Sequence, residues 1–273
     1  MKIALVSGAS SGMGEEMARQ IALRFPSLDE IWITARSEEK LARMEREFPG
    51  KMRAFPGDLT GEQVRTELRD ALIRKNAEIC ILVNAAGYGK LGTVGQVSGS
   101  DTRGMIALNC TALTALTALS LPFLSAKCRI INFASAAAFL PQPGFAVYAA
   151  TKAFVLSYSM ALAKELEPQQ IYVTAVCPGP VDTGFFSVAE EFQKAPFYKK
   201  SFMAKTRRVV ARALSDAFAG KTVSVYGAAM QSLRVLCKVL PHALILKVFS
   251  PCSEANTPRN ASKQRSDGCE KGF

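Results

Sequence analysis

Apolar and polar positions along the chain form two recurring patterns, which are short continuous apolar runs and longer stretches with helical periodicity. The apolar runs predict seven strands, at Ile3–Val6, Ile31–Thr34, Met52–Phe55, Ile79–Val83, Arg129–Ala134, Ile171–Val176 and Thr222–Tyr226. The amphipathic stretches between them predict helices at Gly14–Phe25, Glu38–Phe48, Glu62–Lys75, Thr102–Leu121, Ala149–Glu167 and Lys205–Ala219. Continuously apolar strands that alternate with helices are typical of a parallel sheet covered on both faces. We therefore expect an α/β fold with a Rossmann-like, doubly wound parallel sheet of about seven strands.

Length and composition fit one domain followed by a polar tail. The 273 residues are 49% apolar, which is enough for the core of one large α/β domain. There is no uninterrupted run of 18 apolar residues, so we expect no membrane-spanning helix. We expect a single catalytic domain over residues 1–250. Residues 251–273 lack Leu, Ile and Val, and this composition predicts a disordered tail.

The seven cysteines do not suggest a metal site or a disulfide framework. They form no C-x-x-C pair, and four of them, Cys80, Cys110, Cys128 and Cys177, lie in apolar segments. Such cysteines usually act as small buried hydrophobes. This usage favours a reducing, cytoplasmic setting.

A glycine-rich loop follows the first predicted strand and opens a helix. It comprises Gly8, Ala9, Ser10, Ser11, Gly12, Met13 and Gly14. Glycines in this turn let the backbone approach a pyrophosphate, which the helix N-terminus attracts. Glycines alone could equally mark a plain strand–helix turn, but their position here predicts a dinucleotide site.

Two residues after the next strands indicate which dinucleotide would bind. Ala35 and Arg36 stand where an NAD-binding chain usually has an acid for the ribose 2′-hydroxyl. Because a guanidinium suits a 2′-phosphate, we expect NADP(H). Asp58, followed by Leu59, could accept from an adenine amino group or could cap the next helix.

Tyr148 and Lys152 form the candidate chemical centre. Their spacing of four places them on one helical face, where an ammonium would favour the phenolate and so lower the pKa of Tyr148. The pair could exchange a proton with a carbonyl or an alcohol. Ser135, at the end of the strand Arg129–Ala134, could hydrogen-bond the same substrate oxygen.

The order and spacing of these motifs over residues 1–230 resemble the short-chain dehydrogenase/reductase family. The resemblance includes the glycine loop, Asn84-Ala85-Ala86-Gly87, Asn109, Ser135, Tyr148, Lys152 and Pro178-Gly179-Pro180-Val181-Asp182-Thr183. It implies that Tyr148 is the general acid/base, that Lys152 lowers its pKa and binds the nicotinamide ribose, and that Ser135 polarises the substrate. It further implies that Asn109 holds a water linked to Lys152. The implied cofactor-binding residues are Gly8, Ser10, Ser11, Gly12, Met13, Gly14, Arg36, Asp58, Leu59, Asn84, Ala85, Gly87, Tyr148, Lys152, Pro178, Gly179, Val181 and Thr183.

Aromatic residues dominate the segment after Thr183, where the resemblance implies a substrate lid around residues 184–204. They include Phe185, Phe186, Phe192, Phe197, Tyr198 and Phe202, while Phe139 and Phe145 flank the catalytic motifs. These side chains could line an oily pocket or simply pack the lid onto the body. We expect Ser135, Phe139, Phe145, Tyr148, Phe185 and Phe186 to contact substrate.

The net charge of +11 arises mainly from one late segment. Residues 1–191 carry 19 basic and 19 acidic side chains, whereas residues 192–253 carry eleven basic side chains and one acid, Asp216. This segment could be a solvated basic face, a peripheral contact with an acidic membrane surface, or a contact with an acidic acyl carrier. No nucleic-acid-binding motif accompanies the charge.

Together these features predict an NADPH-dependent reductase that interconverts a ketone and a secondary alcohol. Its substrate would be a hydrophobic carbonyl compound, such as a 3-oxoacyl, steroid-like or aromatic ketone. The resemblance also implies a homodimer or homotetramer. The alternative is a catalytically silent dinucleotide-sensing or interaction protein on the same fold.

Overall fold

The computed structural model describes residues 1–192 and 203–249, with side chains through Leu246. Seven strands form one parallel sheet in the order β3-β2-β1-β4-β5-β6-β9. The strands are β1 (Lys2–Ser7), β2 (Glu30–Ala35), β3 (Met52–Pro56), β4 (Glu78–Asn84), β5 (Leu124–Phe133), β6 (Tyr172–Val176) and β9 (Val223–Ser224). This order confirms the expected Rossmann-like, doubly wound α/β fold.

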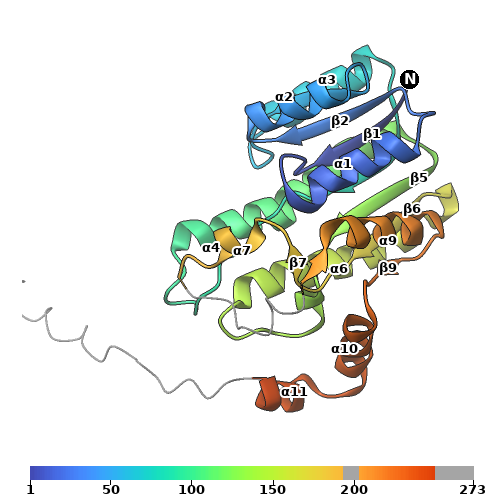
Figure 1. Cartoon of the computed structure of the whole chain (residues 1–273). Coiled ribbons are helices and arrows are strands. Elements are labelled where there is room, and N and C mark those ends of the chain that lie inside the picture. Colours follow the sequence, from blue (N-terminus) through green and yellow to red (C-terminus); the bar gives the residue numbers. More distant parts are fainter. Residues whose placement is uncertain (193–202, 250–273) are drawn as a thin grey trace, which may run out of the picture.

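Helices cover both faces of the sheet (Figure 1). One hydrophobic cluster joins the sheet to α1 (Gly12–Arg24), α2 (Glu38–Glu47) and α9 (Thr206–Phe218). A second cluster joins the opposite face to α3 (Gln63–Arg74), α5 (Leu113–Ser120) and α6 (Ala146–Glu165). The other helices are α4 (Gly99–Ile106), α7 (Phe185–Ala189), α10 (Ala228–Val239) and α11 (His242–Phe249).

The continuous apolar character of β1 follows from its place in the middle of the sheet. Ala4 and Val6 point into the first cluster, whereas Ile3 and Leu5 point into the second. All four are fully buried, since successive side chains of a strand face opposite sides. Burying one such Leu or Ile stabilises the fold by roughly 2 kcal/mol.

Several elements differ from the expectation. The predicted helix Thr102–Leu121 consists of α4, the π-helical segment Ala107–Ala112 and α5. β5 begins five residues earlier than predicted, at Leu124 rather than Arg129, while β9 contains only two residues. The small parallel sheet of β7 (Val181–Asp182) and β8 (Ala204–Lys205) was not predicted, because two-residue strands leave no periodic signal.

Two helical stretches, Gly99–Phe123 and Ala146–Glu165, are long and apolar enough to cross a membrane by length and composition alone. We expected no such stretch, because polar Ser, Thr and Asn residues interrupt their apolar runs. Both stretches contribute to the core: Leu116 of α5 and Leu162 of α6 lie in the cluster that covers the sheet. Their apolar character therefore has an explanation within the fold.

Parts of the predicted lid and tail lie outside the described residues. These parts are Phe197, Tyr198 and Phe202 of the lid, Lys194, Lys199 and Lys200 of the basic segment, and the whole of residues 251–273. The expected disorder of the tail therefore stays a prediction.

A buried carboxylate connects α9 to the last strand. Asp216 is only 4% exposed, and it accepts hydrogen bonds from Arg212 Nε at 2.8 Å, Lys221 Nζ at 2.9 Å and Ser224 Oγ at 2.8 Å. Burial raises its pKa, but the hydrogen bonds from Lys221, Arg212 and Ser224 outweigh burial and hold the pKa below its usual value of 3.8. Asp216 thus neutralises two nearby cations and fixes β9 at the edge of the sheet.

We predict that Asp216→Asn destabilises the protein by about 2 kcal/mol at neutral pH, because it weakens three charge-assisted hydrogen bonds. The folded pKa is depressed, so this contribution is present above pH 4 and is lost as the pH falls through the folded pKa. Urea denaturation of both proteins at pH 7 and pH 3 measures it. Glu167→Gln, which removes an exposed pairing with Lys164, is the control and should change little. Equal effects of the two substitutions would contradict the anchoring role.

Candidate active site

The register of the parallel sheet gathers the candidate residues at one edge. Ser7, the last residue of β1, pairs with Asn84, the last of β4, and Asn84 pairs in turn with Asn132 of β5. The carboxyl ends of parallel strands share one edge of the sheet, where ligands of open α/β sheets bind. The glycine loop, the segment from Asn84 to Gly87, and Ser135 all follow these strand ends.

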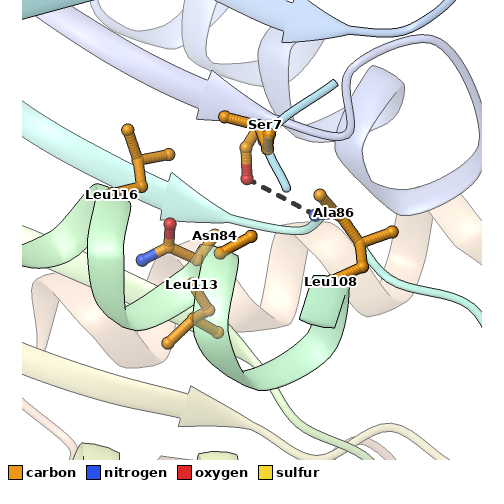
Figure 2. A pocket seen from close by; sticks show the side chains of 8 residues that line it. Ser7, Asn84, Ala86, Leu108, Leu113 and Leu116 are labelled. Atoms are coloured by element: carbon orange, nitrogen blue, oxygen red, sulfur yellow. Dashed lines mark hydrogen bonds between the residues drawn. The ribbon is translucent and has the colours of Figure 1, made fainter. Parts of the chain in front are cut away.

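The glycine loop packs so closely that two of its positions have no room for a side chain. Gly8 has a φ of +69°, and a Cβ there would lie 2.6 Å from the Ala86 nitrogen. A Cβ on Gly14 would lie 2.2 Å from the Gly8 carbonyl oxygen. The Ser7 hydroxyl accepts hydrogen bonds from the Ala85 and Ala86 amides, the second of which is drawn in Figure 2. The loop is therefore clamped onto the end of β4.

The N-terminus of α1 opens from this clamped loop. Ser11 is its N-cap and makes no side-chain capping bond, and the first helical amide bond runs from Glu15 to the Ser11 carbonyl. The amides of Gly12, Met13 and Gly14 precede that bond and have no acceptor within the helix. Such an end attracts a phosphate group. Thr183 lies beside it, 3.4 Å from where a Gly12 Cβ would stand.

The ends of β2 and β3 place Arg36 near Asp58. The Arg36 side chain is exposed. The pKa of Asp58 is lowered, mainly because its carboxylate accepts a hydrogen bond from the Thr60 backbone. Burial opposes this shift in part, whereas the Thr60 hydroxyl and the Arg36 charge add to it. Asp58 Oδ1 accepts from the Thr60 amide at 2.9 Å in the turn before α3, so Asp58 does not cap that helix, whose N-cap is Glu62. The Leu59 side chain is buried in the core, so only its backbone could meet a cofactor.

Tyr148 lies in the first turn of α6 and is 8% exposed. Its ring stacks on Phe145 with centroids 4.3 Å apart, and Phe185 lies at 5.4 Å. Burial raises the pKa of Tyr148 to about 12, and a hydrogen bond with Ser135 opposes the shift only in part. The expected lowering of this pKa is therefore wrong for the described structure, because desolvation of the phenolate dominates.

Lys152 is buried one turn further along the same face of α6. Its ammonium donates a hydrogen bond to the Phe133 carbonyl at 2.8 Å and lies 5.7 Å from the centre of the Tyr148 ring. Burial lowers the pKa of Lys152 to about 8, while Cys110 and Cys177 oppose the shift. A cation that titrates near neutral pH is thus enclosed beside the phenol.

Ser135 begins the short 3-10 turn Ala136–Phe139 directly after β5. Its hydroxyl accepts from the Ala137 amide at 3.1 Å, which fixes the side chain beside Tyr148. The Ala136 amide donates to the Pro178 carbonyl at 2.8 Å and so ties this turn to the loop after β6. Ser135 and Tyr148 can therefore both hydrogen-bond to one substrate oxygen.

The π-helical segment holds Asn109 in the interior. Asn109 Nδ2 donates to the Tyr88 carbonyl at 2.9 Å and to Thr151 Oγ1 at 3.0 Å, and its Oδ1 accepts from the Tyr88 amide at 3.0 Å. A Cβ on Gly87 would lie 2.8 Å from Asn109 Oδ1 and 3.3 Å from Lys152 Nζ. The structure therefore brings Asn109, Gly87 and Lys152 together, as the sequence predicted. The implied water stays a prediction.

Other predicted cofactor residues have mixed positions. The Asn84 amide group points into the core, where Nδ2 donates to Thr117 Oγ1 at 3.0 Å and to Asn132 Oδ1 at 2.9 Å. Val181 is buried in β7. Gly179 lies against α10, since a Cβ there would stand 2.7 Å from the Met230 sulfur. The Asn84 side chain thus stabilises this edge of the sheet from within the core.

The predicted substrate residues divide into two groups. Phe145, Phe185 and Phe186 pack in one cluster with Tyr148. Phe139 lies in a different cluster, with residues of α10 and α11. In the described structure, Phe139 therefore has a packing role and no contact within the Tyr148 cluster.

The segment predicted to be a lid is tied, in its described part, to the loop after β4. The Leu91 amide donates to the Ala189 carbonyl at 2.8 Å, and Lys90 forms an ion pair with Glu191. The Lys90 ammonium also lies 6.0 Å from the Phe192 ring centre. These contacts hold α7 over Tyr148.

Sequence reasoning missed three contributors to the site. A Cβ on Gly89 would lie 2.6 Å from Tyr148 Cδ2, so Gly89 makes room for that ring. Thr151 accepts from Asn109, and the Phe133 carbonyl accepts from Lys152. The glycine could have been noticed in Gly87-Tyr88-Gly89, but a backbone carbonyl leaves no mark in a sequence.

Comparisons with known proteins agree with this geometry. The short chain dehydrogenase family matches residues 2–194. Serine 3-dehydrogenase from Agrobacterium fabrum is 34% identical over 187 residues, which are 66% of this chain and 72% of that protein. A short-chain dehydrogenase from Sphingobium yanoikuyae in complex with NADPH superposes with a TM-score of 0.73 at 29% identity, over 94% of this chain and 99% of the other. A 3-ketoacyl-(acyl-carrier-protein) reductase from Brucella melitensis complexed with NADH gives a TM-score of 0.71 at 26% identity, over 81% and 94%. The matched sequence and the residues collected at the strand ends show that this chain is a member of the short chain dehydrogenase family of oxidoreductases.

Proposed function

We propose that the protein is an NADPH-dependent reductase that converts a hydrophobic ketone into a secondary alcohol. The observation that carries this proposal is the enclosed group of Ser135, Tyr148, Lys152 and Asn109 at the carboxyl ends of β4 and β5. A phenol, a hydroxyl and an ammonium within one buried site suit proton transfer to a carbonyl oxygen.

The residues around the crevice fit a dinucleotide. The amides of Gly12, Met13 and Gly14, which have no acceptor within the helix, would bind the pyrophosphate. Because Gly8 and Gly14 carry no side chains, a ligand can approach the backbone of this loop closely. Lys152, Val181 and Thr183 would hold the nicotinamide end. When bound there, the cofactor supplies the hydride.

The chain's own residues would handle the proton. Ser135 orients the substrate oxygen, and Tyr148 donates its phenolic proton to that oxygen. Burial raises the pKa of Tyr148 to about 12, so the phenol carries the proton that reduction of a carbonyl requires. Lys152 would stabilise the phenolate left after proton transfer, and Asn109 positions the surrounding backbone through Tyr88.

The choice of NADP(H) rests on Arg36. One similar structure contains NADPH and another contains NADH, so membership of the family does not decide between these two cofactors. Arg36 is exposed at the end of β2, where an NAD enzyme would have an acid. Its guanidinium can pair with a 2′-phosphate.

The hydrophobic substrate is inferred from the aromatic cluster above Tyr148. Phe145 and Phe185 cover the phenol, so a substrate carbonyl must displace Phe185 and its neighbours on α7. Residues 184–204 would then act as the lid of a single domain. When a ketone binds, its apolar groups would contact these aromatic side chains in place of the contacts that the rings now make with Tyr148.

A second copy of the chain would cover exposed apolar side chains of α4 and α6. Ile106 of α4 and Phe154 and Met160 of α6 are each more than 40% exposed. Exposed apolar patches of this kind commonly mark association surfaces. We therefore include a homo-oligomer, a dimer or a tetramer, in the proposal.

The alternative, a silent dinucleotide-sensing protein, keeps the glycine loop but needs no proton donor. The retention of Ser135, Tyr148, Lys152 and Asn109 in one site favours the enzyme. Turnover of NADPH with a panel of hydrophobic ketones separates the two proposals.

We predict that Tyr148→Phe lowers kcat/KM for ketone reduction by roughly 10²- to 10⁴-fold while NADPH still binds, because only the proton donor is removed. Steady-state kinetics and NADPH fluorescence titration measure the two effects. Tyr158→Phe, further along α6, is the matched control and should retain activity. Intact turnover in Tyr148→Phe would exclude this proton donor.

We predict that Arg36→Asp raises KM for NADPH by roughly tenfold to a hundredfold and lowers KM for NADH, because the phosphate partner is replaced by a partner for the ribose hydroxyl. The ratio of the two KM values is the measurement. Lys40→Gln, at an exposed position on α2, is the control. An unchanged ratio in Arg36→Asp would remove the basis for NADP preference.

We predict that Lys152→Met stabilises the cofactor-free protein at pH 7 by on the order of 1 kcal/mol although it impairs catalysis. The depressed pKa of about 8 means that burying the ammonium costs stability below pH 8, and this cost disappears as the pH rises to 10.5. The lost bond to the Phe133 carbonyl offsets part of the gain. Urea denaturation should show a difference at pH 7 that shrinks by pH 10. Lys164→Met, at an exposed position, should show neither effect; a pH-independent difference for Lys152→Met would contradict the explanation.

A further inference from the structure

Helix α10 is apolar on two opposite faces, and among the described residues only one of these faces has a packing partner. Its inner face packs in a cluster with the turn Ala136–Phe139 through Met230, Leu233 and Cys237. On the outer face, Val235 is 60% exposed, Leu236 40% and Val239 74%. Surface helices normally present polar side chains to water.

The apolar surface continues across the bend at Pro241 onto α11. Leu244 is 52% exposed, while the adjacent Ile245 is 3% exposed and holds α11 to the body. We call Val235, Leu236, Val239 and Leu244 the α10–α11 ridge. A shallow depression of about 530 Å³ runs along it beside Gln231 and Ser232. Both helices lie at the end of the molecule opposite α2 and α3 (Figure 1).

Positive charge accompanies this ridge without any nearby acid in the sequence. No Asp or Glu occurs between Asp216 and Glu254. Asp216 itself is occupied by Arg212 and Lys221. Lys238 is exposed beside the ridge, whereas Arg234, one turn earlier on α10, is half-buried on the side of Cys177.

We propose that the α10–α11 ridge docks on the surface of an anionic lipid bilayer. Aliphatic side chains would enter the boundary between headgroups and acyl chains, while Lys238 would pair with a lipid phosphate. The four exposed aliphatic residues form a narrow strip, whereas a stable protein interface uses roughly 20–30 residues on each side. An acidic carrier protein would pair with the cations but would leave the aliphatic strip uncovered.

The location of the ridge gives the docking a consequence for the substrate. α10 packs against the turn that starts at Ser135, and Met230 contacts Gly179 in the loop after β6. Docking would thus hold the catalytic end of the sheet close to the bilayer. This consequence rests on the proposed function, and it indicates a ketone that partitions into lipid.

The test is flotation of the full chain, without cofactor or substrate, with vesicles of phosphatidylcholine containing about one third phosphatidylserine. We expect binding at low salt, weaker binding as salt rises, and little binding to pure phosphatidylcholine. Val235→Ser and Val239→Ser should each weaken binding by about tenfold. Lys238→Gln should weaken it by about fivefold.

Matched substitutions of exposed apolar residues elsewhere test whether vesicle binding is specific to the α10–α11 ridge. Leu23→Ser and Val94→Ser change side chains that are 74% and 70% exposed and should leave binding unchanged. The absence of vesicle binding at low salt would overturn the proposal, as would equal losses in the Leu23→Ser and Val239→Ser proteins. It would also be overturned if Val239→Ser abolished self-association in ultracentrifugation while vesicle binding persisted. Because binding is measured without turnover, its failure is distinct from a failure of the reductase proposal.

Discussion

The register of the parallel sheet is the constraint on which the site depends. It aligns Ser7, Asn84 and Asn132 across three strands, so the loops that follow these strands must share one edge. Side-chain bonds reinforce that alignment, because Asn84 donates to Asn132 and Asn132 donates to Ser159 of α6 at 2.9 Å. A single polar chain in the interior therefore fixes the sheet to the helix that carries Tyr148 and Lys152.

The burial that organises the site also costs free energy, because it removes ionisable groups from water. Desolvation raises the pKa of Tyr148 and lowers that of Lys152, so each group resists its charged form. The fold offsets part of this cost because the Lys152 ammonium donates a hydrogen bond to the Phe133 carbonyl.

Sequence reasoning succeeded where the signal was local. Continuous apolar runs placed the central strands. The spacing of Gly8, Ser135, Tyr148 and Lys152 predicted that these residues lie at one edge of the sheet, because each motif follows a strand or lies within one helical turn. It failed where distant contacts decide the outcome. The π-helical segment depends on bonds from Asn109 to Tyr88 and Thr151, and the separation of Phe139 from Phe145 depends on α10 and α11. The direction of the Tyr148 pKa shift likewise depends on burial, which spacing does not report.

The π-helical segment has a further consequence for how such a chain can vary. In an α-helix each residue advances the direction of the side chains by about 100°, and a π bulge behaves as one extra residue within the helix. Loss of a single residue between Ala107 and Ala112 would let the segment close into a regular helix without turning α4 against α5, so Leu116 would keep its place in the core. The change would fall on the bulge itself, where Asn109 bonds to Tyr88 and Thr151. The extra residue of this helix therefore concerns the position of Asn109 and not the packing of the helix on the sheet.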